Sequence, residues 1–138
     1  MEYQASCSCP HNKVQLSLIL PKAIEQYQPR ACDCDFCVAL DLAYLSDPAG
    51  QLDVFNSRNI EYAQQGSEQA LFARCKTCHS LLFVSYEFAS GIKGAINAKL
   101  LADNYALTEP ISVSPKTLLP DEKLERWQAT WLPLNLWP

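Results

Sequence analysis

The chain has 138 residues, which is the size of one domain, and 49% hydrophobic with 19% charged residues is the composition of a globular protein. Its 11 Lys and Arg against 15 Asp and Glu give a net charge of −4, which argues against the basic surface of a nucleic-acid-binding protein. No apolar run approaches the ~20 residues of a membrane span, and the N-terminus lacks a secretory signal, so we expect a cytoplasmic protein without a membrane partner.

Short strands are predicted over the first two thirds of the chain. The expected strands alternate apolar and polar side chains, or are rich in β-branched and aromatic residues between turn signals: 14–20, 52–55, 59–63, 69–75 and 81–88. The segments 52–55 and 59–63 are predicted to pair with each other around residues 56–58, and Gln65-Gly66 is predicted to form the next turn.

The C-terminal quarter is the one part that the pattern predicts to be helical. Asp121 can cap the start of a helix, and Leu124, Trp127 and Trp131 recur at the spacing of one helical face until Pro133 ends the helix. We expect these Trp side chains to pack in the core rather than to stack on a ligand. The sequence therefore predicts a single domain over residues 1–138, mainly all-β, with one short C-terminal helix.

Seven cysteines are the most informative residues of the chain. They fall in three short-spaced groups with the patterns C-x-C, C-x-C-x-x-C and C-x-x-C: Cys7 and Cys9; Cys32, Cys34 and Cys37; Cys75 and Cys78. Thiolates on one tight turn can converge on one ion, whereas a disulfide framework spreads its cysteines, and an odd number leaves one over. The pattern predicts zinc binding.

Spacing alone does not decide which cysteines share an ion. Four thiolates close a tetrahedral zinc site, whereas three leave one position for water or a substrate thiol. The two outer groups could share one zinc and leave the central group open, or Cys34 and Cys37 could complete a site with either outer pair. His11 and His79 lie close to cysteine groups, and we expect both to be exposed turn residues rather than ligands.

The order of these cysteine groups, with Ser80 and Leu82-Phe83 after the last, resembles the glutathione-dependent formaldehyde-activating enzyme family, which includes the centromere protein V domain. The resemblance runs from Cys7 to about Leu101. It implies a zinc-binding domain of twisted antiparallel β-sheets with up to two Zn²⁺ per chain. The implied structural zinc site is Cys7, Cys9, Cys75 and Cys78, and the implied open, catalytic zinc site is Cys32, Cys34 and Cys37.

The function implied by this resemblance is carbon–sulfur lyase chemistry on a thiol adduct such as S-(hydroxymethyl)glutathione, with glutathione and formaldehyde as the reacting pair. Three thiolates make zinc a weak Lewis acid, so a substrate thiol suits the open position better than water does. A thiolate held beside an aldehyde is a nucleophile at high local concentration. The alternative is a non-catalytic two-zinc β module that binds a protein or a small thiol.

The chain departs from the family pattern around its cysteines. Asp33 and Val38 stand where the family commonly has a basic or His residue and an Arg, so this loop has less positive charge for an anionic thiol. His79 stands where Gly is usual, because that turn often requires a positive φ. Arg30, like the lysines elsewhere in the chain, is expected to be a surface cation unless it meets a ligand carboxylate.

Overall fold

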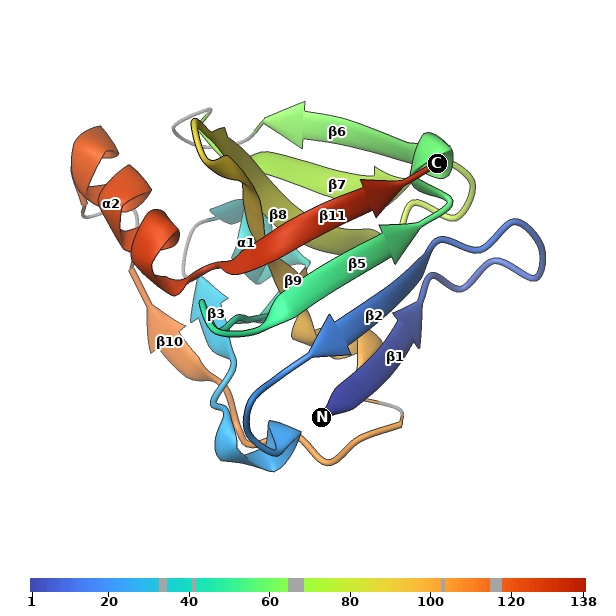
Figure 1. Ribbon diagram of the computed structural model, residues 1–138, viewed down its shortest axis with the longest axis horizontal. Coiled ribbons are helices and arrows are strands. Elements are labelled where there is room, and N and C mark those ends of the chain that lie inside the picture. Colours follow the sequence, from blue (N-terminus) through green and yellow to red (C-terminus); the bar gives the residue numbers. More distant parts are fainter. Residues whose placement is uncertain (33–34, 41, 65–68, 103, 115–117) are drawn as a thin grey trace.

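A computed structural model describes residues 1–32, 35–64 except 41, 69–114 except 103, and 118–138 (Figure 1). Its strands follow in chain order: β1 (Glu2–Ser6), β2 (Gln15–Ile19), β3 (Arg30–Cys32), β4 (Tyr44–Leu45), β5 (Gln51–Phe55), β6 (Ile60–Gln64), β7 (Leu71–Cys75), β8 (Leu81–Phe88), β9 (Gly91–Asn97), β10 (Ile111–Val113) and β11 (Leu132–Trp137). The helices are α1 (Asp35–Ala39) and α2 (Pro120–Thr130), with 3-10 turns at Ile24–Gln26, Ser57–Asn59 and Ala98–Leu100. The mainly β class with one longer helix near the C-terminus is confirmed.

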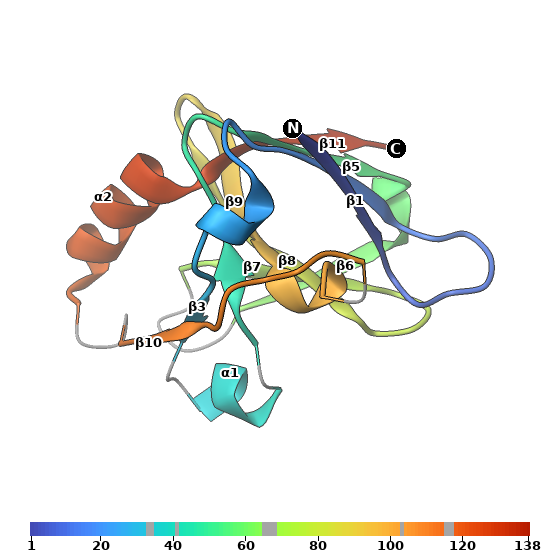
Figure 2. The same ribbon diagram turned by 90° about the horizontal axis from the view of Figure 1, so that it is seen from below.

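The strands form one twisted, mixed sheet that branches. Its main path runs β1-β2-β5-β11-β9-β4-β3-β10, and β8, β7 and β6 continue from β9 as a second arm. Most neighbours are antiparallel, as expected, but β3–β10 and β5–β11 are parallel pairs. Figure 1 shows β1, β2, β5 and β11 side by side, and Figure 2, seen from below, shows β6, β7 and β8 in a second layer.

The core fills the space between these two layers. Strands β2 and β5 send alternate side chains inward, and Leu16, Leu18, Leu52 and Val54 are fully buried. Phe83 of β8 is also fully buried and belongs to the same cluster. Because each such side chain stabilises the folded state by about 1.5–3 kcal/mol on burial, the alternation in the sequence sets the face that β2 and β5 turn to the core.

The expected strands at 14–20, 69–75 and 81–88 are confirmed as β2, β7 and β8. The predicted pairing of 52–55 with 59–63 is wrong, because β5 pairs with β2 and β11 whereas β6 pairs with β7. Asn56 adopts a left-handed conformation with φ 62° and leads into the Ser57–Asn59 3-10 turn, which carries the chain from one layer to the other. The predicted turn at Gln65-Gly66 lies outside the described residues.

Helix α2 begins two residues earlier than predicted. Leu119 takes the N-cap position and its N–H donates a hydrogen bond of 2.8 Å to the Glu122 carboxylate, so Asp121 lies within the first turn. The helix ends at Thr130, where the Trp131 backbone becomes extended, and Pro133 lies inside β11. Neither helix in the described part of the chain has the length and apolar character needed to cross a membrane.

Gly94 on β9 permits the close approach of three strands, so we expect Gly94→Ala to destabilise the fold. A Cβ at this position would lie 2.5 Å from the Val84 carbonyl oxygen and 3.1 Å from Leu134 Cδ1. The strands would have to separate, at a cost of about 1–3 kcal/mol in the free energy of unfolding. Urea denaturation measures this cost, with Ser90→Ala at the exposed end of the same hairpin as the control. Equal stability of the two variants would contradict this packing.

Candidate metal centre and cysteine-lined cavity

Four cysteines from two turns that are far apart in the sequence lie close together in the structure. Cys7 and Cys9 follow β1, whereas Cys75 ends β7 and Cys78 lies in the turn before β8. Their Sγ atoms all lie within 4.8 Å of one another, and Cys9 Sγ is 3.5 Å from Cys75 Sγ. A tetrahedral ion with metal–sulfur bonds of about 2.3 Å places its sulfurs about 3.8 Å apart. The four sulfurs are therefore close enough to hold a metal ion.

Backbone hydrogen bonds shape the two turns that carry these cysteines. The Cys7 N–H donates to the Val14 carbonyl at 3.1 Å, and the Val14 N–H donates to Cys7 Sγ at 3.4 Å. In the second turn the His79 N–H donates to the Cys75 carbonyl at 2.9 Å, and the Cys75 N–H donates to the Ser80 carbonyl at 3.0 Å. These hydrogen bonds help to hold the turns that bring the four sulfurs together.

The second turn needs a left-handed residue, and His79 supplies it with φ 61°. Gly adopts this conformation most easily because it has no Cβ, so a His residue here carries modest backbone strain. Its imidazole is exposed, with Nδ1 3.5 Å from the Glu61 carboxylate, and His11 is exposed as well. The prediction that both histidines are exposed turn residues is confirmed.

The thiols of this cluster differ in acidity. Burial raises the pKa of Cys9 to about 12, and hydrogen bonding to the neighbouring thiols adds to the effect. Burial also acts to raise the pKa of Cys78, but hydrogen bonds from Ser80, Ser8 and Cys9 overcome it and lower this pKa to about 5. Cys78 is therefore the first of the two to become a thiolate, which is the form that ligates metal.

We expect Cys78→Ser to unfold the protein or leave it poorly soluble. Its side chain helps to join turns that are about seventy residues apart, and metal binding by such a site contributes on the order of 10 kcal/mol, comparable to the stability of a whole domain. Thermal melting together with metal analysis tests this. The control is Lys76→Ala, an exposed change in the same turn, which should melt and bind metal like the unaltered chain.

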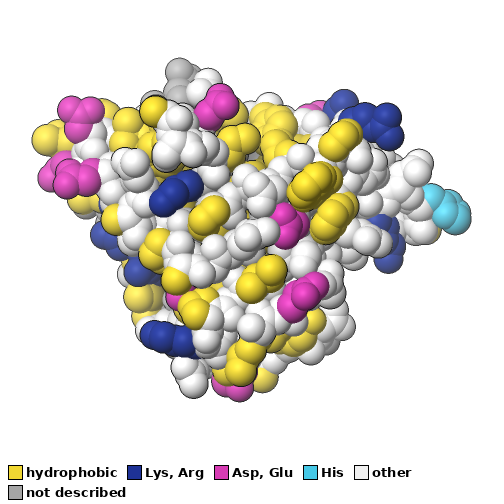
Figure 3. Space-filling model, in the orientation of Figure 1, with side chains coloured by type: hydrophobic (Ala, Val, Ile, Leu, Met, Phe, Trp, Pro, Cys, Tyr) yellow, Lys and Arg dark blue, Asp and Glu magenta, His cyan; other side chains and the backbone are white. Residues whose placement is uncertain are grey.

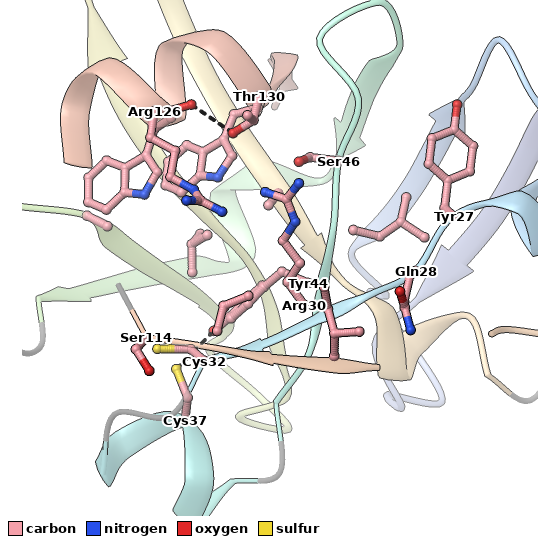
Figure 4. Close-up of a pocket in the computed structure, with 18 of the residues that line it drawn as sticks. Tyr27, Gln28, Arg30, Cys32, Cys37, Tyr44, Ser46, Ser114, Arg126 and Thr130 are labelled. Carbon is pink, nitrogen blue, oxygen red and sulfur yellow. Dashed lines mark hydrogen bonds between the residues drawn. The ribbon is translucent and has the colours of Figure 1, made fainter. Parts of the chain in front are cut away.

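A cavity of about 700 Å³ lies away from this cluster and contains two of the three central cysteines in its wall. Cys32 ends β3 and Cys37 lies on α1, where it is buried with its Sγ 3.7 Å from the Tyr44 hydroxyl. Figure 4 shows the two cysteine side chains together at one end of the cavity. Cys34, the third predicted ligand, lies outside the described residues.

Helix α2 forms a wall of this cavity that sequence analysis did not assign to a site. Trp127 and Trp131 stack with ring centroids 4.7 Å apart, and Arg126 and Thr130 line the cavity beside them. Trp131 is buried, as expected for a core residue, yet both indoles also contribute to the lining. The signal in the sequence was the helical spacing of the aromatic residues, which does not distinguish a core face from a cavity wall.

The structure thus defines a mainly β domain with four cysteines placed to hold a metal ion and a separate cavity lined in part by cysteines. No protein-family model and no curated protein sequence matches the chain. It is similar in structure to a Rhodobacter sphaeroides protein solved as a structural genomics target, with a TM-score of 0.52 and 19% sequence identity, covering 78% of this chain and 99% of that chain. At this identity the similarity shows a shared fold alone.

Proposed function

We propose that this protein is a zinc-dependent carbon–sulfur lyase of the glutathione-dependent formaldehyde-activating type. The observation that carries the proposal is the position of Cys32 and Cys37 in the wall of a cavity large enough for a small organic molecule. The four-cysteine centre is closed and structural, whereas the central cysteines have space beside them for a substrate. We further propose that the protein acts in the cytoplasm and that its partner is a small thiol such as glutathione.

Zinc is the metal that we propose for both sites. Soft thiolate donors favour zinc over magnesium or calcium, and four thiolates around one point are the ligand set of structural zinc. Cys7, Cys9, Cys75 and Cys78 fit that set by the separation of their sulfurs. At the second site the proposed ligands are Cys32, Cys34 and Cys37.

Zinc bound by three thiolates would keep a substrate thiol deprotonated near neutral pH. The cavity wall would hold the substrate beside that thiolate. Its lining combines apolar side chains, among them Phe72 and Val84, with polar ones such as Ser46. The reaction joins a thiol sulfur to the aldehyde carbon, the proton of the thiol goes to the carbonyl oxygen, and nothing is oxidised or reduced. The reverse reaction breaks the same carbon–sulfur bond.

One observation favours the alternative, a non-catalytic module that binds a protein or a small thiol. The described residues that line the cavity include no Asp, Glu or His, the usual groups for proton transfer. The Tyr44 hydroxyl, 3.7 Å from Cys37 Sγ, and Ser114 beside Cys32 (Figure 4) are polar groups at the cysteine end that could move a proton in an enzyme. Turnover therefore separates the two functions, whereas thiol binding alone does not.

We expect Cys34→Ser to abolish thiol binding and carbon–sulfur bond formation while the protein stays folded. The three proposed ligands of this zinc site are within one short segment, so binding zinc there removes little conformational entropy from the unfolded chain. The two thiolates that remain in the variant hold zinc poorly. Zinc-loaded protein is titrated calorimetrically with glutathione, and adduct formation from glutathione and formaldehyde is followed by NMR. Thermal melting and zinc analysis of Cys34→Ser are compared with those of Cys78→Ser.

The outcomes separate the candidates. Loss of one zinc equivalent and of turnover in a stable Cys34→Ser variant supports the enzyme. Thiol binding without any rate enhancement supports the binding module instead. If Cys34→Ser unfolds the chain as severely as Cys78→Ser does, the central cysteines are structural and the enzyme proposal is wrong.

A further inference from the structure

Two arginines converge on the cavity from elements that are far apart in the sequence. Arg30 lies on β3, two residues before Cys32, and Arg126 lies on α2 next to Trp127. Figure 4 shows their guanidinium groups directed toward the same part of the cavity, at the end away from the two cysteine sulfurs. Side chains two residues apart on a strand share a face, so Arg30 and Cys32 both face the cavity. Their positions are about 7 Å apart along β3.

The charge in this cavity is opposite to that of the protein as a whole. The chain has a net charge of −4, yet the described lining contains two Arg and no Asp or Glu. Among the described residues, neither guanidinium has a carboxylate partner, whereas Arg74 pairs with Glu61 elsewhere on the fold. Figure 3 shows both basic and acidic side chains on one face of the molecule, whereas the described lining of the cavity holds basic ones alone.

The two guanidiniums are directed toward the same space, and both residues are exposed to solvent. Two like charges held together without a counter-charge are unfavourable, and an anion between them removes that repulsion. Carboxylates suit the planar donors of Arg, which can offer two parallel hydrogen bonds.

Apolar side chains form part of the cavity wall. Val84 and Ala95 of the central strands contribute to it from the sheet, and Trp127 and Trp131 contribute from α2, beside polar residues. A hydrogen bond of 2.7 Å from Lys93 Nζ to the Gln128 carbonyl ties α2 to β9. A short hydrocarbon chain can lie against these apolar side chains without placing unpaired amide groups there.

We propose that Arg30 and Arg126 bind the carboxylate of an organic thiol whose body is hydrocarbon and whose sulfur reaches the Cys32–Cys37 end of the cavity. This substrate class deepens the proposed function and rests on it for the role of the sulfur. The arginines supply the positive charge that the central cysteine loop lacks with Asp33 and Val38. Within the small thiols of the proposed function, the thiol that we expect is a mercaptoalkanoate, and glutathione, with two amides and an ammonium group, is the competing ligand.

Calorimetric titration of zinc-loaded protein with four probes tests the proposal: 6-mercaptohexanoate, hexanoate, 6-mercapto-1-hexanol and glutathione. We expect 6-mercaptohexanoate to bind most tightly and hexanoate to bind detectably without a thiol. Arg30→Gln and Arg126→Gln should each weaken binding of both carboxylates by about five- to tenfold and leave 6-mercapto-1-hexanol unchanged. Lys123→Gln removes one charge from the same helix outside the cavity lining and is the matched control.

The probes also separate this inference from the proposed function. Hexanoate has no sulfur, so its dependence on the arginines is measured even if Cys34→Ser shows that the central site binds no thiol. Equal affinity for 6-mercaptohexanoate and 6-mercapto-1-hexanol, or arginine variants that behave like Lys123→Gln, would overturn the inference while leaving the thiol chemistry standing. Tighter binding of glutathione than of 6-mercaptohexanoate would overturn the preference for a hydrocarbon body.

Discussion

The meeting of Cys7 and Cys9 with Cys75 and Cys78 is the contact on which the rest of this structure depends. It joins the turn after β1, in one layer, to the turn between β7 and β8, in the other. Hydrophobic burial favours a collapsed chain of this size, but it does not by itself fix how two layers of short strands lie on each other. Four cysteine sulfurs that lie close enough to hold a metal ion can fix it, since a tetrahedral ion accepts one geometry.

The parts of the fold that could be predicted are those in which one local pattern decides the outcome. Alternation set the buried face of β2, and the dense run of apolar and aromatic residues gave β8 its bounds. Strand β9 escaped prediction because Gly91, Lys93 and Gly94 interrupt its pattern, although contacts with β8 and β11 stabilise it. The pairing of β5 with β11 could not be predicted either, because the paired residues are more than eighty positions apart in the chain.

The two sites differ in how much of each could be predicted from the sequence. Short-spaced cysteines identify metal ligands directly, and the grouping of the outer four, implied by the family resemblance, is the grouping that the structure brings together. The cavity has no such motif. Its wall combines β3, the central strands and one face of α2, so Arg126 becomes part of a site only when the sheet places α2 opposite Arg30. A single basic residue on a predicted helix does not indicate a binding site in the sequence. Its place in the cavity becomes visible only in the tertiary structure.

Strand β11 has a consequence for the way the protein is made. Its first residues pair with β9 and its later residues pair in parallel with β5, so this one strand joins the two arms of the sheet. It follows every other strand in chain order, and α2, which walls the cavity, comes just before it. During synthesis the edge of β5 that faces away from β2 therefore stays uncovered until β11 has been made. Such late, non-local pairing slows folding and leaves a strand edge open to pairing with other chains in the meantime.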